Sequence, residues 1–386
     1  MGARAVSPRR FRPYAAAVAL IASALWVGTI PAAAEQPKLA ATELTTADQA
    51  AVDATTSTTA TDATSNEATA SETTISQPAA AADERAAPAG GPLTQRTLIE
   101  PPLLAQRVAA GTLPPIAERL PTNPRVMTLQ EPGRHGGTMR TLFGRTKDIR
   151  LMTVYGYARL IGFDRTLNLT ADILESYEVI DGRKFTLRLR AGHRWSDGAP
   201  FTAEDFRYYW EDIASDETIS PLGPGAIFKV NGDLPTFEVL DALTVRYTWA
   251  APNAEFLPAL AAPRPPFIYR PAHYLKQFHA RYADKKTLKA IVKKKRQRNW
   301  RALHFKMDRP YRNDNIAYPT LQPWKNTTKP PSQRFVFKRN PYFHRIDEAG
   351  RQLPYIDEVA AGIASAKLIP LKVGTGDAEF QARGLE

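Results

Sequence analysis

TLRLRAGHRWSDGAPFTAEDFRYYWED, residues Thr186–Asp212, is the stretch that decides the fold. Its first residues alternate, with Leu187 and Leu189 apolar and Arg188 and Arg190 charged. This is the period of a β-strand that buries one face, because successive side chains point to opposite sides. The opening of the stretch therefore predicts a strand at the edge of a hydrophobic core.

The second half of the stretch predicts a turn and then a capped helix. Ser196–Gly198 is a turn signal, because glycine accepts backbone angles that other residues resist. Thr202 is a good N-cap, and Glu204 and Asp205 place carboxylates in the first turn, where the helix dipole favours them. Three aromatic residues then recur at helical spacing on one face: Phe206, Tyr209 and Trp210.

Two motifs carry a resemblance to a known family. Leu-Arg-x-Gly-x-x-Trp-Ser-Asp-Gly-x-Pro-Phe-Thr-Ala-Glu-Asp-Phe, at Leu189–Phe206, resembles the signature of the family 5 extracellular solute-binding proteins, which are peptide and oligosaccharide receptors of ABC importers. Arg339–Tyr342 (Arg-Asn-Pro-Tyr) and Pro354–Glu358 (Pro-Tyr-Ile-Asp-Glu) resemble the family's second signature. The resemblance implies an α/β, periplasmic binding protein-like fold of type II, in which two lobes close over the ligand. We interpret Trp195 as the seal of a strand–helix corner, not as part of the binding site.

The start of the chain is typical of an exported protein. Four arginines precede an apolar run at Ala15–Trp26, and Ala32–Ala34 is a small-residue cleavage site. This pattern predicts a secretory signal peptide over residues 1–34, because the apolar run is too short for a membrane span. The chain has no cysteine. Disulfides, metal thiolates and a lipid-modified cysteine are therefore excluded, and we expect a soluble periplasmic protein without a lipid anchor.

A long segment without aromatic residues follows the signal peptide. Glu35–Pro92 is rich in Thr, Ala and Ser, and its nine acidic and two basic residues give a net charge of −7. Such a segment cannot bury enough apolar surface to offset the entropy of ordering it. We expect residues 35–96 to be a disordered linker, and residues 97–386 to form the N-terminal part of a solute-binding domain.

Several elements of that domain are predicted from local patterns. We expect two short helices in Leu103–Pro124, a strand at Gly136–Arg140, a polar loop at Gly144–Met152 and a helix at Val154–Leu160. Two hairpins are predicted, one at Tyr177–Arg190 with the turn Asp181-Gly182 and one at Phe237–Trp249 with the turn Asp241-Ala242. A pair of helices is expected at Lys285–Arg312, and a strand at Gln333–Lys338.

The formal net charge of +12 is concentrated in one segment. Residues 285–312 contain twelve basic residues and one acidic residue, and four further arginines belong to the predicted signal peptide. We interpret the segment as surface helices with a solvated basic face. A nucleic-acid module would interleave basic residues with exposed aromatic ones, so we predict no nucleic-acid partner. Attraction to an anionic ligand or to a membrane surface is the alternative.

The end of the chain departs from the family. Gly374–Glu379 resembles the turn that opens the second lobe, but the chain stops at Glu386. We expect the first lobe and the crossing strands only, with the second lobe largely missing. The chain would then be a truncated product or a fragment, and an inactive fragment is one alternative for its function.

No catalytic motif is visible. Gly-x-Ser-x-Gly and His-Glu-x-x-His are absent, the six histidines form no recognisable ligand pair, and we attribute Asp205 and Glu211 to capping and solvation. We therefore expect no catalytic residue, metal or cofactor, and a secreted peptide- or glycan-processing hydrolase remains the enzymatic alternative. The resemblance implies a monomer that captures an oligopeptide or oligosaccharide-like solute for an ABC permease.

The resemblance also suggests where a ligand would bind. Four residues stand where the first-lobe cleft elements of the family pass, namely Arg145, Tyr155, Leu222 and Trp324. Tyr155 and Trp324 would offer flat apolar faces to side chains or sugar rings. Arg145 could bind a carboxylate. These four are the predicted ligand-binding residues.

Overall fold

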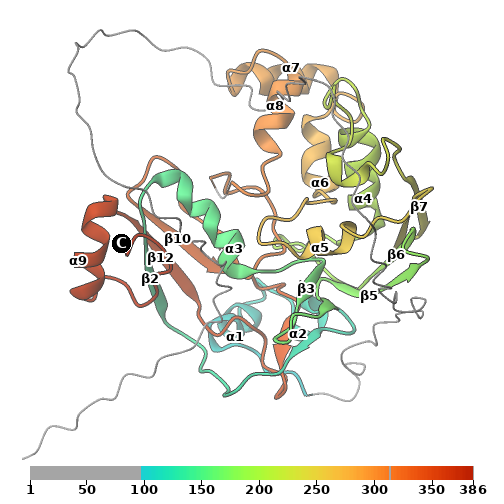
Figure 1. Ribbon diagram of the computed structural model, residues 1–386. Helices are drawn as coiled ribbons and strands as arrows, with labels where there is room; N and C mark the ends of the chain where they lie inside the picture. Colours follow the sequence, from blue (N-terminus) through green and yellow to red (C-terminus); the bar gives the residue numbers. More distant parts are fainter. Residues whose placement is uncertain (1–96, 313, 386) are drawn as a thin grey trace, which may run out of the picture. The chain divides into compact units, whose positions relative to one another are not determined.

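The computed structural model describes residues 97–312 and 314–385 (Figure 1). The predicted signal peptide and linker lie outside these residues. The described part contains strands and helices in mixture, as the resemblance implied. It has two four-stranded sheets, one of them purely antiparallel and the other mixed.

The antiparallel sheet is built from the two predicted hairpins, which are confirmed. Its strand order is β5-β6-β8-β7, and its bounds are Leu174–Ile180 (β5), Lys184–Leu189 (β6), Thr236–Asp241 (β7) and Thr244–Thr248 (β8). Asp181 and Gly182 have φ values of 53° and 62°, as a type I′ turn requires. In the centre of the sheet Leu187 lies opposite Val245, and both side chains are fully buried.

The capped helix follows this sheet as predicted. α4 spans Ala203–Tyr209, with a capping box in which Thr202 accepts a hydrogen bond and the Asp205 carboxylate accepts one from the Thr202 amide. The helix then widens into a π-helical turn, η3, at Trp210–Ala214. The aromatic face of α4 and η3 packs on the sheet, where Phe206 of α4 and Trp210 of η3 belong to the largest hydrophobic cluster of the described residues.

The mixed sheet joins segments that are more than 200 residues apart in sequence. Its order is β2-β12-β10-β9, with bounds Thr138–Phe143 (β2), Trp324–Asn326 (β9), Arg334–Arg339 (β10) and Glu358–Ile363 (β12). β2 pairs with β12 in parallel, and β12 pairs with β10 in antiparallel orientation. This confirms the predicted strands at Gly136–Arg140 and Gln333–Lys338. Figure 1 shows the three long strands side by side.

Two smaller pairs of strands and two short helices complete this region. The strand pairs are parallel β1 with β11 and antiparallel β3 with β4, with bounds Arg125–Met127 (β1), Ile161–Phe163 (β3), Leu169–Ala171 (β4) and Arg345–Asp347 (β11). The two helices predicted in Leu103–Pro124 are confirmed as α1 (Pro102–Ala109) and α2 (Ile116–Arg119). Arg119 is completely buried and pairs with Glu100.

The remaining helices lie between the two signature regions and at the end of the chain. Their bounds are Ala226–Phe228 (η4), Phe256–Ala261 (α5), Ala272–Leu275 (α6), Lys276–Phe278 (η5), Lys285–Lys294 (α7), Trp300–Met307 (α8), Ala366–Leu368 (η6) and Ile369–Gly374 (α9). α7 and α8 confirm the predicted helix pair, and Leu288 and Leu303 join them in one hydrophobic cluster. None of the helices in the described ranges has the length and apolar character that a membrane crossing requires.

One local prediction is wrong. The segment expected to be a polar loop, Gly144–Met152, contains the 3-10 helix η2 at Thr146–Leu151, which continues into α3 at Met152–Gly156. The helix expected at Val154–Leu160 therefore starts and ends earlier. Ile149 and Leu151 are buried against the mixed sheet, so tertiary packing imposes helical structure on a stretch that looks polar in sequence. Tyr157 ends α3 with a left-handed φ of 41°.

Candidate functional site

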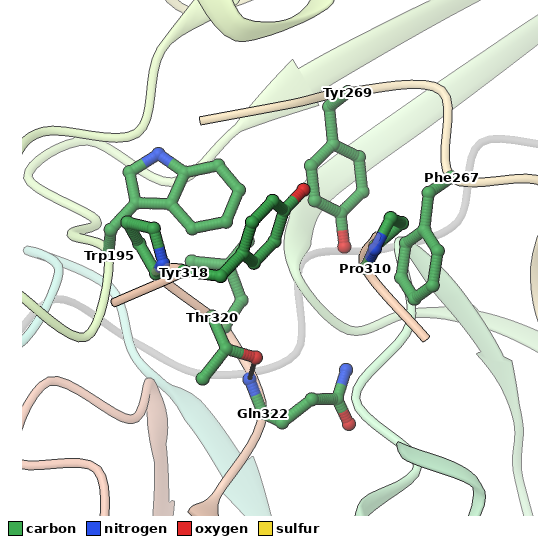
Figure 2. Close-up of a pocket in the computed structure, with 9 residues that line it drawn as sticks. Trp195, Phe267, Tyr269, Pro310, Tyr318, Thr320 and Gln322 are labelled. Carbon is green, nitrogen blue, oxygen red and sulfur yellow. Dashed lines mark hydrogen bonds between the residues drawn. The ribbon is translucent and has the colours of Figure 1, made fainter. Parts of the chain in front are cut away.

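The family signature forms a packed corner of the fold. Trp195 is 2% exposed, and its indole Nε1 donates a hydrogen bond to Asp205 Oδ2 at 3.1 Å. Figure 2 shows Trp195 with Tyr269 and Phe267 around a cavity of about 20 Å³. That volume holds about one water molecule. The interpretation of Trp195 as the seal of a strand–helix corner is confirmed.

The attribution of the two carboxylates to capping and solvation is confirmed, with one addition for Asp205. Glu211 is exposed and pairs with Arg207 at 2.7 Å. Asp205 caps α4 as expected, but it is buried, and it also accepts the Ala272 amide at 3.0 Å. Burial raises the pKa of Asp205 to about 7, and its hydrogen bonds oppose this rise. Asp205 thus joins the signature turn, α4 and α6.

A cavity with cationic walls lies where β2 ends. Its volume is about 330 Å³, and its walls include the loop after β2, η2 and residues near the end of the chain. The charged side chains of the lining are those of Arg145, Lys147, Asp148, Arg150 and Arg383. No ion pair within the described residues engages any of these five, so the cavity carries an uncompensated excess of cations. Arg150 Nε is buried without a hydrogen-bond partner.

Aromatic side chains pack beside this cavity. The Tyr155 ring stacks on Phe143 with a centroid distance of 6.1 Å and meets Phe380 edge-on at 5.4 Å. Phe143 itself lines the cavity. Burial raises the pKa of Tyr155, the Arg383 cation lowers it, and Asp148 raises it. Tyr155 therefore lies close to the charged groups of the cavity wall.

The four predicted ligand-binding residues are only partly brought together. Arg145 lines the cavity, while Tyr155 and Trp324 belong to the hydrophobic cluster under the same mixed sheet. Trp324 is half-buried, and its Nε1 donates to the Ile356 carbonyl at 3.0 Å. Leu222 lies elsewhere, 90% exposed on the connection between η3 and η4. Their role in binding stays a prediction for all four.

Sequence reasoning missed the contribution of the last described residues. The segment Glu379–Gln381 lies along the outer edge of β2, where the Glu379 carboxylate forms an ion pair with Arg140. The side-chain amide of Gln381 binds both backbone groups of Leu142, accepting from its N–H and donating to its carbonyl, each at 3.0 Å. No local pattern signalled this contact, because the Gly374–Glu379 turn resembles the one that opens the second lobe of the family.

A second cavity of about 550 Å³ lies between Pro265–Phe267 and the segment after α8. Most of its charged side chains are paired with each other or with neighbours. Arg270 binds Asp308 at 2.6 Å, and Arg312 binds Asp314 at 2.7 Å. Only Arg309 among its charged lining residues has no ion pair within the described chain. The cavity at the end of β2 therefore has the stronger capacity for a charged solute.

Buried histidines form a cluster that the sequence did not reveal. The rings of His193 and His344 lie 4.9 Å apart, and His344 Nε2 is 2.9 Å from Asp172 Oδ1. Burial lowers the pKa of His344 to about 4, while Asp172 opposes the shift. Within the described residues, no group of three or more histidine, aspartate or glutamate side chains has an arrangement that could hold a metal ion.

The chain is similar to solute-binding proteins over much of its length. Residues 168–367 match the family model described as "Bacterial extracellular solute-binding proteins, family 5 Middle". A curated relative, the periplasmic alpha-galactoside-binding protein of Rhizobium meliloti (strain 1021), is 31% identical over 277 residues. That alignment covers 65% of this chain and 37% of the relative.

Two solved structures resemble the fold. An oligopeptide-binding protein OppA matches with a TM-score of 0.68 and 32% identity, over 75% of this chain and 45% of that one. The periplasmic binding protein MelB of Agrobacterium fabrum C58, in complex with stachyose, matches with a TM-score of 0.58 and 26% identity, over 74% and 44%. The chain thus spans less than half the length of these three proteins.

Proposed function

Because this chain belongs to the family 5 bacterial extracellular solute-binding proteins, we propose that it captures an oligopeptide in the periplasm and delivers it to the membrane permease of an ABC importer. Capture and delivery need no chemical step, so the proposed protein is a monomeric receptor and not an enzyme. The predicted export signal over residues 1–34 and the periplasmic relative support this compartment.

The choice of a peptide as ligand rests on the cationic cavity at the end of β2. Four cations and one carboxylate line it, and its volume of about 330 Å³ falls in the range of small-molecule sites. A guanidinium binds a carboxylate through two parallel hydrogen bonds, so Arg145 suits the C-terminal carboxylate of a peptide. The neighbouring aromatic rings of Tyr155 and Phe380 would contact an apolar side chain next to that carboxylate.

A neutral oligosaccharide is the second candidate. It is favoured by the similarity to the alpha-galactoside-binding protein and to the structure that holds stachyose. Sugars bind by stacking on aromatic faces and by hydrogen bonds, and such a ligand would not need the cationic excess of the cavity.

The two candidates are separated by melting the full chain with three ligands: a pool of tripeptides, the same pool with amidated C-termini, and stachyose. Ligand that binds the native state raises the melting temperature. We expect stabilisation by free-acid peptides, and about tenfold weaker binding of the amidated pool, since one charged hydrogen-bonded group is worth at least about 1.4 kcal/mol.

Matched variants assign the effect to the cavity. Arg145→Ala should remove the preference for free acids, whereas Arg165→Ala, an exposed arginine outside the cavity, should leave it unchanged. Stabilisation by stachyose and not by peptides would show that the ligand is an oligosaccharide. Equal binding of the acid and amide pools would show that the cations do not recognise the peptide carboxylate. Hydrolysis of the peptides in the mixture would show that the protein is an enzyme.

A further inference from the structure

Ten exposed cations gather on α7, α8 and the loop between them. On α7 they are Lys285, Lys286, Lys289, Lys293 and Lys294. Lys285, Lys289 and Lys293 recur at four-residue spacing and so share one side of the helix. A different side of the helix packs against the protein, with Leu288 buried and Ile291 and Val292 partly buried.

The loop and α8 extend the same positive region. Lys295, Arg296 and Arg298 are exposed in the loop, and Arg301 and Lys306 are exposed on α8. The two helices contact each other, as Figure 1 also shows. We call these ten residues the basic face.

No carboxylate in the described part of the chain forms an ion pair with any residue of the basic face. The two nearest acids in sequence are already engaged. Asp284 caps α7 by accepting the Thr287 amide at 2.8 Å, and Asp308 binds Arg270. Elsewhere arginines find partners, as Arg207 does with Glu204, Glu211 and Asp212. The basic face is therefore left uncompensated by the fold.

We propose that the basic face docks the protein on an anionic phospholipid bilayer. Clusters of four to eight Lys or Arg bind such surfaces, and each cation near the surface contributes about fivefold in affinity. Because Leu288, Ile291 and Val292 of α7 pack into a hydrophobic cluster of the protein, α7 is not an inserting amphipathic helix and the binding is electrostatic. Phe305, 67% exposed on α8 beside Lys306, supplies an aromatic side chain suited to the interface.

The composition favours lipid over nucleic acid. Seven of the ten cations of the basic face are lysines, which act as point charges and lack the paired donors of arginine. Base stacking needs aromatic platforms between the cations, and within the described part of this region Phe305 is the exposed aromatic residue. A diffuse array of this kind fits many headgroups without fixed geometry. The proposal does not rest on the identity of the solute.

The test is co-sedimentation of the full chain with vesicles of phosphatidylcholine, with and without about 30% phosphatidylglycerol. We expect binding that requires phosphatidylglycerol and is lost by about 0.3 M salt, where screening is strong. The variant Lys285→Glu, Lys289→Glu, Lys293→Glu should bind at least about a hundredfold more weakly.

The matched control reverses three exposed cations outside the basic face, Lys329→Glu, Arg334→Glu and Lys367→Glu, with the same change in net charge. It should keep affinity within about threefold of the wild type. All three proteins share residues 1–34, so their difference reports the substituted positions. Circular dichroism checks that both variants fold. Equal loss in the control, binding without phosphatidylglycerol, or preferential binding of duplex DNA at the same salt would overturn the proposal.

Discussion

Asp205 connects three segments with one buried carboxylate. It accepts hydrogen bonds from the Trp195 indole, the Thr202 amide and the Ala272 amide at 3.0–3.1 Å. The residues of the family signature thus form a hydrogen-bonded junction. Its acidic residue holds the corner together and reaches no cavity described above.

Asp205→Asn should therefore destabilise the protein by about 2–4 kcal/mol, because the amide group places N–H donors against other N–H donors. Urea unfolding followed by tryptophan fluorescence measures the loss. Glu211→Gln, which affects an exposed pair, should cost less than about 0.5 kcal/mol. Equal stability of the wild type and Asp205→Asn would show that the junction is not important for the fold.

The same residue predicts a dependence on pH. Burial raises the pKa of Asp205 to about 7 in the folded protein, whereas an unfolded aspartate titrates near about 4. Between these values the folded state binds more protons, so this group makes the wild type less stable as pH rises from about 4 to 7. The asparagine variant lacks the effect. The cost of Asp205→Asn should be smaller at pH 7 than at pH 5, by about 2 kcal/mol.

At the scale of elements, the hairpins were the most predictable part of the chain. Asp181-Gly182 was recognised because few residue pairs accept two positive φ angles, and alternation then fixed which side chains are buried. η2 was missed because its lysine and arginine make the segment look polar in sequence, although Ile149 and Leu151 are buried. The short β1, β3, β4 and β9 were missed because three residues are too few to show a period.

The turn of the first hairpin can be tested directly. Gly182→Ala should lower the free energy of unfolding by about 1–2 kcal/mol. The alanine must adopt a left-handed φ, and its Cβ would lie 3.3 Å from Pro252 Cβ. Gly225→Ala is the matched control, with φ of −60° and no atom within 4 Å of the added Cβ. It should change the unfolding free energy by less than about 1 kcal/mol and in the stabilising direction. A similar loss in both variants would argue against a role for the turn.

At the scale of the molecule, the candidate site depends on contacts that no local pattern reveals. Arg145, which the resemblance marked, lies between β2 and η2 and lines the cavity. Sequence could not place Phe380 or Arg383, since their neighbours lie more than 200 residues earlier in the chain. Leu222 was selected on the same resemblance, and the structure places it apart from the cavity. Long-range pairing therefore brings the lining of this cavity together.

One ion cluster couples the early and late parts of the described chain. Asp172, which follows β4, binds Arg345 of β11 at 2.8 Å, and Arg190 donates to its backbone carbonyl at 3.0 Å. Asp172→Asn would leave buried cations without their counter-charge, and it should cost about 3–5 kcal/mol. Asp181→Asn, in an exposed pair with Arg183, should cost less than about 1 kcal/mol. Circular dichroism and fluorescence should report the same midpoint for each protein; separate midpoints would mean that the two parts unfold independently.

The Gln381 amide has a consequence for association between molecules. A β-strand at the edge of a sheet normally offers its N–H and carbonyl groups to any extended chain that approaches, which is how sheets grow into aggregates. On the outer edge of β2 the backbone groups of Arg140 and Leu142 are already bonded, the first to Glu379 and the second to the Gln381 side chain, which takes the place of a neighbouring strand. This stretch of the edge therefore has no free backbone pair with which a second molecule could start a continuous intermolecular sheet.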